Sequence, residues 1–188
     1  RLFVSMGWEV VTIKYGKLLH RAFEQPGGDA LRQWIDSCPN SKYSTLVYKG
    51  GGAWREALQA DIGSRSSVSE LLARYDDRAL NALMTNLGGH CIESMLEAFE
   101  SVGDDKPTCF FAYTIKGFGL PLAGHKDNHA GMLTSDQIER LKSEHNISDG
   151  EEWIPSAGTG VAESELHSFL HSAPFCTASQ RRKNSPVV

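Results

Sequence analysis

The chain has 188 residues, a formal net charge of −4 and a hydrophobic share of 40%. This length fits a single domain, or one domain and a fragment, and is enough to bury a core. The only basic run, at 181–183, does not amount to the clustered basic face that nucleic acid requires, so we expect no nucleic-acid binding. No apolar run approaches the roughly 20 residues that span a bilayer, so we expect no membrane segment.

The four cysteines lie far apart in the sequence, at Cys38, Cys91, Cys109 and Cys176. Because no CxxC pair occurs, neither a zinc knuckle nor a disulfide framework is expected. A reducing, cytoplasmic location is the default for such a chain. We expect Cys91 and Cys109 to behave as buried small hydrophobic residues.

The first elements alternate between strand and helix. The chain opens on "RLFVSMGWEVVTI" without an initiator Met, which indicates the end of a helix running into a strand and predicts that the start of a domain is missing. Residues 8–16 are β-branched and aromatic, which is typical of a strand. In 17–38 the helical spacing is interrupted at "QPGG", so two short helices are expected before Pro39. The stretch 43–54 is interpreted as a short extended piece before the triple glycine, with a helix as the alternative.

Two amphipathic helices are expected next. Residues 67–87 have helical spacing, with Ser67 as the cap and Glu70 three residues later, and Gly88 and Gly89 end this helix. Residues 90–103 place Ile92, Met95, Leu96 and Phe99 on one face of a second helix. The leucines and aromatic residues of 68–99 are expected to form the core.

The run "TCFFAYTIKG" (108–117) is nearly all apolar, as in a strand of a parallel sheet that helices cover on both faces. Strand, helices and buried strand together predict an α/β fold. Beyond it we expect a helix over 134–146, with Thr134 as its cap and Gln137 at its third position. A turn at 148–153, a weak helical piece at "ESELHSFLHS" and a linker at 174–188 follow.

A loop rich in polar residues, "AGHKDNHAGM" (123–132), follows the apolar strand. Ligands of open α/β sheets bind beyond the carboxyl ends of the strands, which makes this loop a candidate site. A histidine there can transfer protons near neutral pH. The alternative is a solvated loop, with Lys116 as an ordinary surface lysine.

Four segments, taken in order, resemble a known enzyme family. The segment "YTIKGFGLPLAGHKDNHAG" is similar to thiamine-diphosphate enzymes of the transketolase type, in which a strand ends in a T-[IV]-K-G-[FYW]-G-like motif before a His-bearing loop. The segments "GWEVVTIKYGKLLHRAF", "YSTLVYKGGGAWREAL" and "NLGGHCIESMLEAF" resemble the homodimeric, decarboxylating first component of pyruvate dehydrogenase. The likeness runs from about residue 2 to residue 153.

The resemblance implies roles for residues of the last segment. His129 matches the loop histidine that meets the bound intermediate and transfers protons, and Lys116 matches a lysine near the cofactor or substrate. The remaining matched residues are expected to bind or approach the cofactor: Gly117, Gly119, His125 and Asn128. The loop is closer in pattern to the transketolase "HDVHG" than to the pyruvate dehydrogenase loop, which leaves the substrate open.

Three polar residues elsewhere are given other roles. His90 is expected to be mainly structural, bonding to backbone at a helix start, because Cys91 stands where the family has an aspartate. Arg55 and Glu56 fit a solvated helix or a subunit contact equally well.

The resemblance also implies a cofactor and a domain plan. The cofactor would be thiamine diphosphate with Mg²⁺, but the G-D-G motif that supplies metal ligands is missing and would precede Arg1, so no metal ligand is expected in this chain. Residues 1–155 would form the C-terminal half of a pyrophosphate-binding domain, a partial thiamin diphosphate-binding fold with helices flanking a parallel sheet. Residues 156–188 would be a linker toward a missing pyrimidine-binding domain.

The expected function is oxidative decarboxylation of pyruvate or another 2-oxo acid, with acyl transfer to a lipoyl arm, by a full-length parent. The resemblance implies a homodimer with a lipoyl acyltransferase partner, and the fragment alone is expected to be inactive. One alternative is a transketolase, which moves a two-carbon ketol unit between sugar phosphates. A second is a noncatalytic interaction module whose loop histidines are surface residues.

Overall fold

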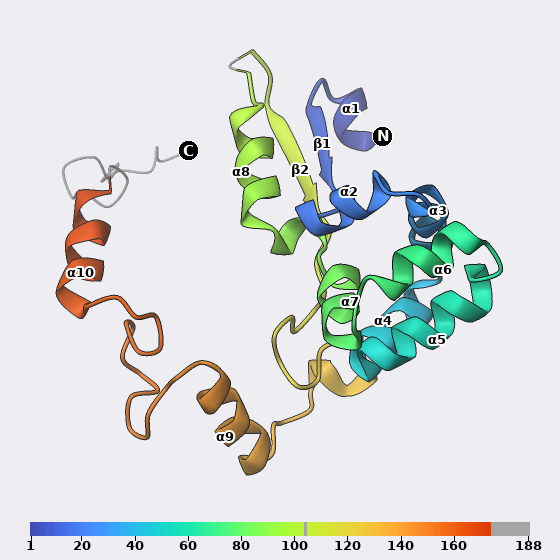
Figure 1. The fold of residues 1–188 in the computed structure, drawn as a ribbon. Coiled ribbons are helices and arrows are strands. Elements are labelled where there is room, and N and C mark those ends of the chain that lie inside the picture. The colour runs from blue at the N-terminus through green and yellow to red at the C-terminus, as the bar shows by residue number, and fades with distance from the viewer. Residues whose placement is uncertain (104, 174–188) are drawn as a thin grey trace. The chain divides into compact units, whose positions relative to one another are not determined.

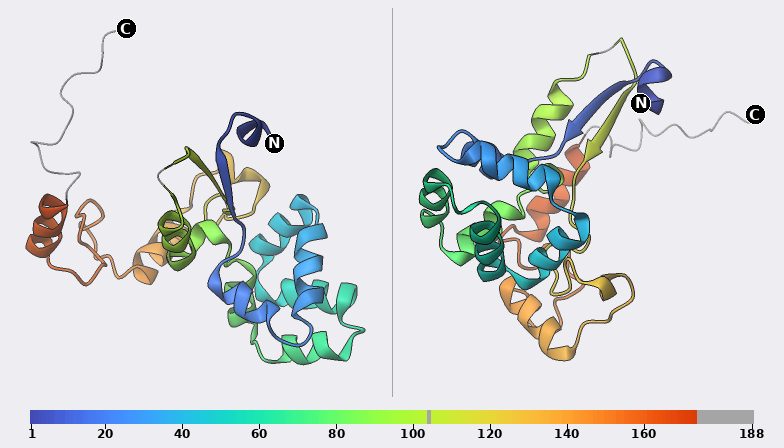
Figure 2. Two further views of the ribbon diagram at one scale, coloured as in Figure 1. Left: turned by 90° about the horizontal axis from the view of Figure 1, so that it is seen from above. Right: turned by 90° about the vertical axis from the view of Figure 1, so that its right-hand side faces the viewer.

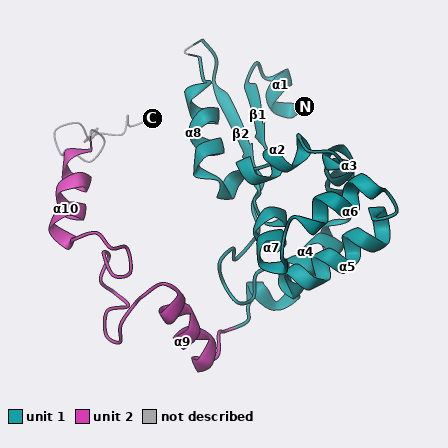
Figure 3. Ribbon diagram, viewed as in Figure 1, with its two compact units in different colours: residues 1–131 teal, residues 132–188 magenta. Residues whose placement is uncertain are grey.

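The computed structural model describes residues 1–103 and 105–173. Figure 3 shows two compact units, residues 1–131 and residues 132–188, which are taken here one at a time. The sequence placed the end of the domain at 155, and the assignment of 1–155 to a cofactor domain and of 156–188 to a linker stays a prediction. The segment 174–188, with Cys176 and the basic run, lies outside the described residues.

A two-stranded parallel sheet organises the first unit. Strand β1 (Glu9–Ile13) pairs with β2 (Thr108–Ala112), with Glu9 opposite Thr108 and Ile13 opposite Ala112. The two strands lie side by side in Figures 1 and 2. Because parallel strands need a crossover connection, the helices between them complete an α/β unit. The expected α/β class, with helices flanking a parallel sheet, is confirmed.

Short helices lie next to this sheet. Helix α1 (Leu2–Ser5) precedes β1, and the Phe3 ring meets that of Phe111 at 5.9 Å. Helix α8 (Ile92–Glu100) precedes β2, and its Phe99 ring meets Phe110 at 4.9 Å. The expectation that β2 is buried on both faces is wrong for this structure, since Phe111 is 46% exposed.

A helical cluster follows β1 and contains the core (Figure 1). Its helices are α2 (Lys17–Phe23), α3 (Gly28–Ser37), α4 (Asn40–Lys49), α5 (Gly51–Ile62), α6 (Ser66–Ala73) and α7 (Asp77–Met84), followed by the 3₁₀ turn η1 (Gly88–His90). Trp54 and Leu58 of α5 are fully buried among leucines of the other helices. The two predicted helices before Pro39 are confirmed.

The expectation of an extended piece at 43–54 is wrong, because α4 and α5 occupy it. Gly50, at φ 82°, separates the two helices. Leu46, Trp54 and Leu58 enter the core from these helices. Their burial outweighs the strand preference of the valine and aromatic residues nearby.

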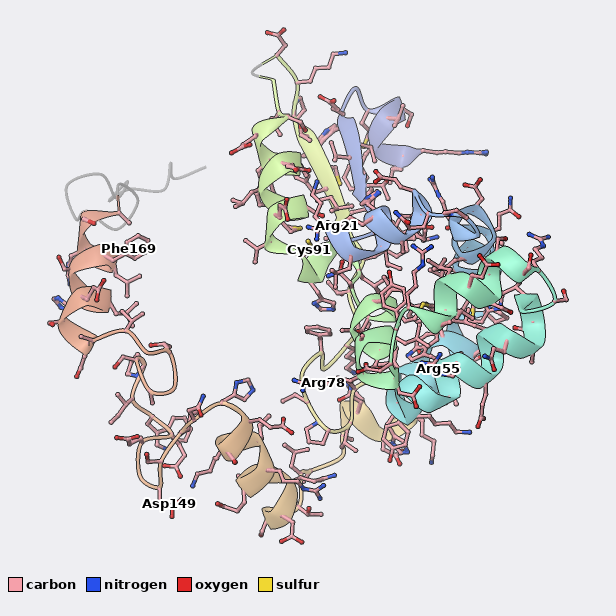
Figure 4. All side chains as sticks on the ribbon, viewed as in Figure 1. Arg21, Arg55, Arg78, Cys91, Asp149 and Phe169 are labelled. Atoms are coloured by element: carbon pink, nitrogen blue, oxygen red, sulfur yellow. The ribbon has the colours of Figure 1, made fainter. Side chains whose placement is uncertain are left out.

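The single helix expected over 67–87 is also wrong, because it divides into α6 and α7. Asp76 caps the second helix, because its side chain accepts the Ala79 N–H. Ser67 is not a cap, because α6 already begins at Ser66 and has no side-chain cap. Arg55 of α5, labelled in Figure 4, closes the break: its guanidinium donates to Asp77 at 2.7 Å and to the Tyr75 carbonyl at 2.6 Å. Arg55 therefore braces α5 against the start of α7 within this unit.

Helix α8 forms as expected, but its apolar face does not join the core. Ile92 is 73% exposed and Leu96 is 54% exposed. Cys91 and Cys109 are half-buried rather than buried. The described cysteines, Cys38 included, are free thiols.

The second unit contains α9 (Ser135–Glu144) and α10 (Glu163–Ser172). Thr134 and Gln137 form the predicted capping box at the start of α9, which is confirmed. Lys142 donates to the carboxylates of Asp149 and Glu152, which holds the pKa of Lys142 above its ordinary value and anchors the turn after α9. Among the described residues no helix has the length and apolar character required to cross a bilayer.

Candidate functional site

A cavity of about 650 Å³ opens in the first unit where both strands end. Its walls come from the residues after β1, the α3–α4 region, the residues after β2 and the polar loop. The strand ends are joined by the Tyr113 N–H, which donates to the Ile13 carbonyl at 3.0 Å. The carboxyl edge of a parallel sheet is where ligands bind in open α/β folds, so the cavity is the candidate site.

Lys116 and His129 meet in this cavity. The Lys116 Nζ lies 2.7 Å from the His129 Nδ1. An ammonium group can only donate, so the Nδ1 accepts and the proton of a neutral His129 ring resides on Nε2. The sequence reasoning named both residues, and the structure brings them together across twelve intervening residues.

Asn128 ties the loop back to the strand end. Its Nδ2 donates to the Lys116 carbonyl at 2.7 Å. A Cβ at Gly117, where φ is +71°, would lie 2.6 Å from this amide, so the position requires glycine. Asn128 thus fixes the backbone that carries Lys116.

The same loop is docked on α4. A Cβ at Gly124 would lie 2.3 Å from the Ser44 carbonyl oxygen, so backbone meets backbone there. The His125 ring lies 4.5 Å from that of Tyr48, and its Nδ1 accepts the Asp127 N–H at 3.1 Å. These contacts, together with the short helix η2 (Lys126–His129), fold a loop that has little apolar content of its own.

Four of the six predicted site residues line the cavity: Lys116, His125, Asn128 and His129. Gly117 and Gly119 do not line it. The space beside Gly117 is filled by Asn128, whereas a Cβ added at Gly119, where φ is +80°, would meet nothing within 4 Å. The cofactor-binding role of the two glycines stays a prediction.

The sequence reasoning missed a charged cluster on the opposite wall. Lys14, just after β1, and Tyr15 both donate to the same oxygen of Asp36 on α3. Burial opposes the charge of Lys14, but the bonds to Asp36 and Tyr15 outweigh it and raise the pKa of Lys14. Burial likewise opposes ionisation of Asp36, and the bonds from Lys14 and Tyr15 outweigh it and lower the Asp36 pKa. Both groups are therefore charged at neutral pH.

Only the parallel pairing of β1 with β2 reveals Lys14 as a site residue. It lies at the end of one strand and Lys116 follows the end of the other, about a hundred positions later in the sequence. The signal that was available was its position near the carboxyl end of the predicted strand 8–16.

His90 bonds to backbone, as expected, but at the strand end rather than at a helix start. Its Nε2 accepts the Ile115 N–H at 2.7 Å, and its ring stacks on Phe118 at 3.9 Å. Burial disfavours the charged ring and lowers the pKa of His90. Its neighbour Cys91, labelled in Figure 4, accepts the Lys17 N–H at 3.4 Å.

Within residues 1–103 and 105–173, no three His, Cys, Asp or Glu side chains gather closely enough to hold a metal ion. The side chains that the loop and the end of β2 bring to the cavity are lysine, imidazole and amide groups, which suit an anionic organic ligand and proton transfer.

The curated proteins that this chain resembles include pyruvate dehydrogenase E1 components from several bacteria. No family model matches the chain. The pyruvate dehydrogenase E1 component of Escherichia coli K12 is 27% identical over 179 residues, which are 91% of this chain and 20% of the relative. That of Corynebacterium glutamicum is 26% identical over 175 residues, and that of Mycobacterium tuberculosis is 22% identical over 175 residues.

The chain spans about a fifth of the length of these curated relatives. The resemblance that the sequence motifs indicated is confirmed. Over about nine-tenths of its length, this chain is a distant relative of pyruvate dehydrogenase E1 components.

Proposed function

We propose that the chain is part of a longer pyruvate dehydrogenase E1 component that oxidatively decarboxylates pyruvate or another 2-oxo acid. The observation that carries this proposal is the Lys116–His129 pair, 2.7 Å apart in a cavity at the carboxyl edge of the sheet. The similarity to E1 components over most of the chain supports it.

His129 acts in this proposal as the group that donates and accepts a proton. With Nδ1 occupied by Lys116, the Nε2–H is the atom that can donate to a substrate oxygen in the cavity. Lys116 fixes the ring orientation and the tautomer. Asn128, through the Lys116 carbonyl, keeps the lysine at the strand end.

The cavity favours an anionic substrate. Its lining includes Lys14, Lys116 and Lys126, and among the described lining residues Asp36 is the single carboxylate. Because Asp36 is already bonded to Lys14 and Tyr15, it repels an incoming carboxylate less than an unpaired acid would. A 2-oxo acid carries the negative charge that such a lining attracts.

The proposed cofactor is thiamine diphosphate with Mg²⁺. Bound in such enzymes, the cofactor stabilises the carbanion that remains when CO₂ leaves. The cationic cavity fits the substrate end of this chemistry. As the family resemblance implies, the metal ligands are proposed to lie in the longer protein, upstream of this chain.

The partners belong to the proposal as well. The longer protein would be a homodimer that passes its acyl group to the lipoyl arm of an acyltransferase subunit. The free thiols of the described residues agree with a cytoplasmic location. Residues 1–155 would be the second half of the cofactor domain and 156–188 a linker, so this chain alone should not turn over substrate.

The test uses the longer protein with thiamine diphosphate and Mg²⁺. We expect it to reduce an artificial electron acceptor with pyruvate, and Lys116→Met to lower kcat/KM by about 100-fold. Lys106→Met, an exposed lysine before β2, serves as the control and should leave the rate unchanged. Turnover of sugar phosphates in place of pyruvate would establish a transketolase, and no turnover of either would leave a binding role.

A further inference from the structure

The turn η1 contacts both strands at the carboxyl edge of the sheet. The Gly88 N–H donates to the Lys14 carbonyl at 3.0 Å, and the Gly89 N–H donates to the Tyr113 carbonyl at 2.9 Å. A Cβ at Gly88 would lie 2.4 Å from the Ile13 carbonyl oxygen, so the turn is in direct backbone contact with β1. The turn therefore holds the ends of β1 and β2 together.

His90 extends this contact to the segment that carries Lys116. Its Nε2 accepts the N–H of Ile115, the buried residue directly before Lys116. Its ring stacks on Phe118, two residues after Lys116, with a 13° angle between the planes. One side chain thus contacts residues on both sides of the lysine, the backbone of Ile115 and the ring of Phe118.

Lys116 is in turn tied to the polar loop by both its backbone and its side chain. Its carbonyl accepts the Asn128 amide at 2.7 Å, and its Nζ lies 2.7 Å from the His129 Nδ1. Both contacts are 2.7 Å long, so a backbone shift of the order of 1 Å away from the loop is enough to take them beyond hydrogen-bonding distance. The geometry of the proton-transferring pair therefore depends on where Ile115 is held.

We propose that His90 is a positioning residue of the site: by accepting the Ile115 N–H and stacking on Phe118, it aligns Lys116 with His129. This inference rests on the proposed function, in which that pair handles the proton. Burial lowers the pKa of His90, so its Nε2 is free to accept at neutral pH. His90 touches no substrate in this proposal and acts only through the strand end.

The experiment compares variants of the longer protein by kinetics and by hydrogen exchange of the peptide that contains Ile115. His90→Phe keeps a ring on Phe118 but removes the acceptor. We expect Ile115 to exchange about tenfold faster and kcat to fall about tenfold, while KM stays within about twofold. His90→Gln, which restores an acceptor of similar reach, should recover most of both losses. A purely structural role would lower the amount of folded protein without this split between kcat and KM.

A second pair keeps the test decisive if His90→Phe does not fold. His90→Gln and His90→Met have similar length and both lose the ring, so their ratio of kcat isolates the acceptor. Equal kcat and equal Ile115 exchange in this pair would overturn the proposal, as would wild-type exchange or kcat in folded His90→Phe.

His129→Ala separates this inference from the proposed function. Unchanged turnover in His129→Ala would refute the catalytic pair itself, and with it any effect of alignment on rate. If His129→Ala loses turnover but His90→Phe keeps it despite faster Ile115 exchange, only the positioning role is overturned.

Discussion

Gly124→Ala should undock the polar loop from α4. Gly124 has φ +77°, and a Cβ there would lie 2.3 Å from the Ser44 carbonyl oxygen and 3.0 Å from the Val47 Cβ. The left-handed backbone alone costs an alanine about 1–2 kcal/mol. The overlap with the helix backbone cannot be relieved by rotating a side chain, and overpacking of this kind adds about 1–3 kcal/mol.

Gly7→Ala is the matched control for this change. Gly7 has φ +83°, but a Cβ there meets nothing within 4 Å, so only the backbone cost remains. We expect Gly124→Ala to lower the free energy of unfolding by about 1–3 kcal/mol more than Gly7→Ala in urea titrations of this chain.

The same substitution reports on function in the longer protein. An undocked loop separates His129 from Lys116, so kcat should fall in Gly124→Ala and stay at the wild-type level in Gly7→Ala. Equal stabilities of the two variants, together with equal kcat, would refute the idea that contact with α4 folds the loop.

Three further predictions concern Arg55, Lys14 and His90. Arg55→Met, which removes the bonds to Asp77 and Tyr75, should lower the free energy of unfolding by about 2 kcal/mol, and a loss under about 0.5 kcal/mol in urea titrations would contradict this. Lys14→Met should raise KM for an anionic substrate about tenfold with little change in kcat. Steady-state kinetics measures both constants, and a fall in kcat with unchanged KM would contradict this prediction. Because the pKa of His90 is lowered on folding, its contribution to stability is complete above its unfolded value of about 6.5 and is lost as the pH falls below it. Urea titrations between pH 7.5 and pH 5 should show this loss in the wild type and a smaller one in His90→Phe.

Elements set by local signals were predictable from the sequence. The capping box of Thr134 and Gln137, a motif only four residues long, marks the start of α9. The segment "QPGG" marks the break between α2 and α3. The break before α7 had a signal too, because Asp76 is a good cap three residues before Ala79, but the unbroken leucine spacing concealed it.

Features that depend on distant partners were not predictable. The α4–α5 segment is helical because Trp54 and Leu58 are buried by other helices, which no local pattern states. The apolar spacing of α8 gives the direction of its face but not whether a partner covers it, and Leu96 is exposed.

Some residues of the candidate site could be identified from a local pattern, and others depend on tertiary contacts. Lys116 and His129 stood out because they belong to one loop after a strand, whereas Lys14 and Asp36 approach them only through the parallel pairing of β1 and β2. The contact of His90 with Ile115 likewise joins residues 25 positions apart. Sequence motifs identified the loop, and tertiary contacts supplied the groups that hold it.

The most direct test of the account is the rate of CO₂ release from pyruvate by the longer protein carrying His129→Ala. General acid–base catalysis contributes about 10²–10⁴-fold, so we expect kcat to fall by that factor in a protein that keeps its fold. The control variant His145→Ala should keep the wild-type kcat. A kcat within about threefold of the wild type would contradict the claim that His129 transfers a proton in the cavity.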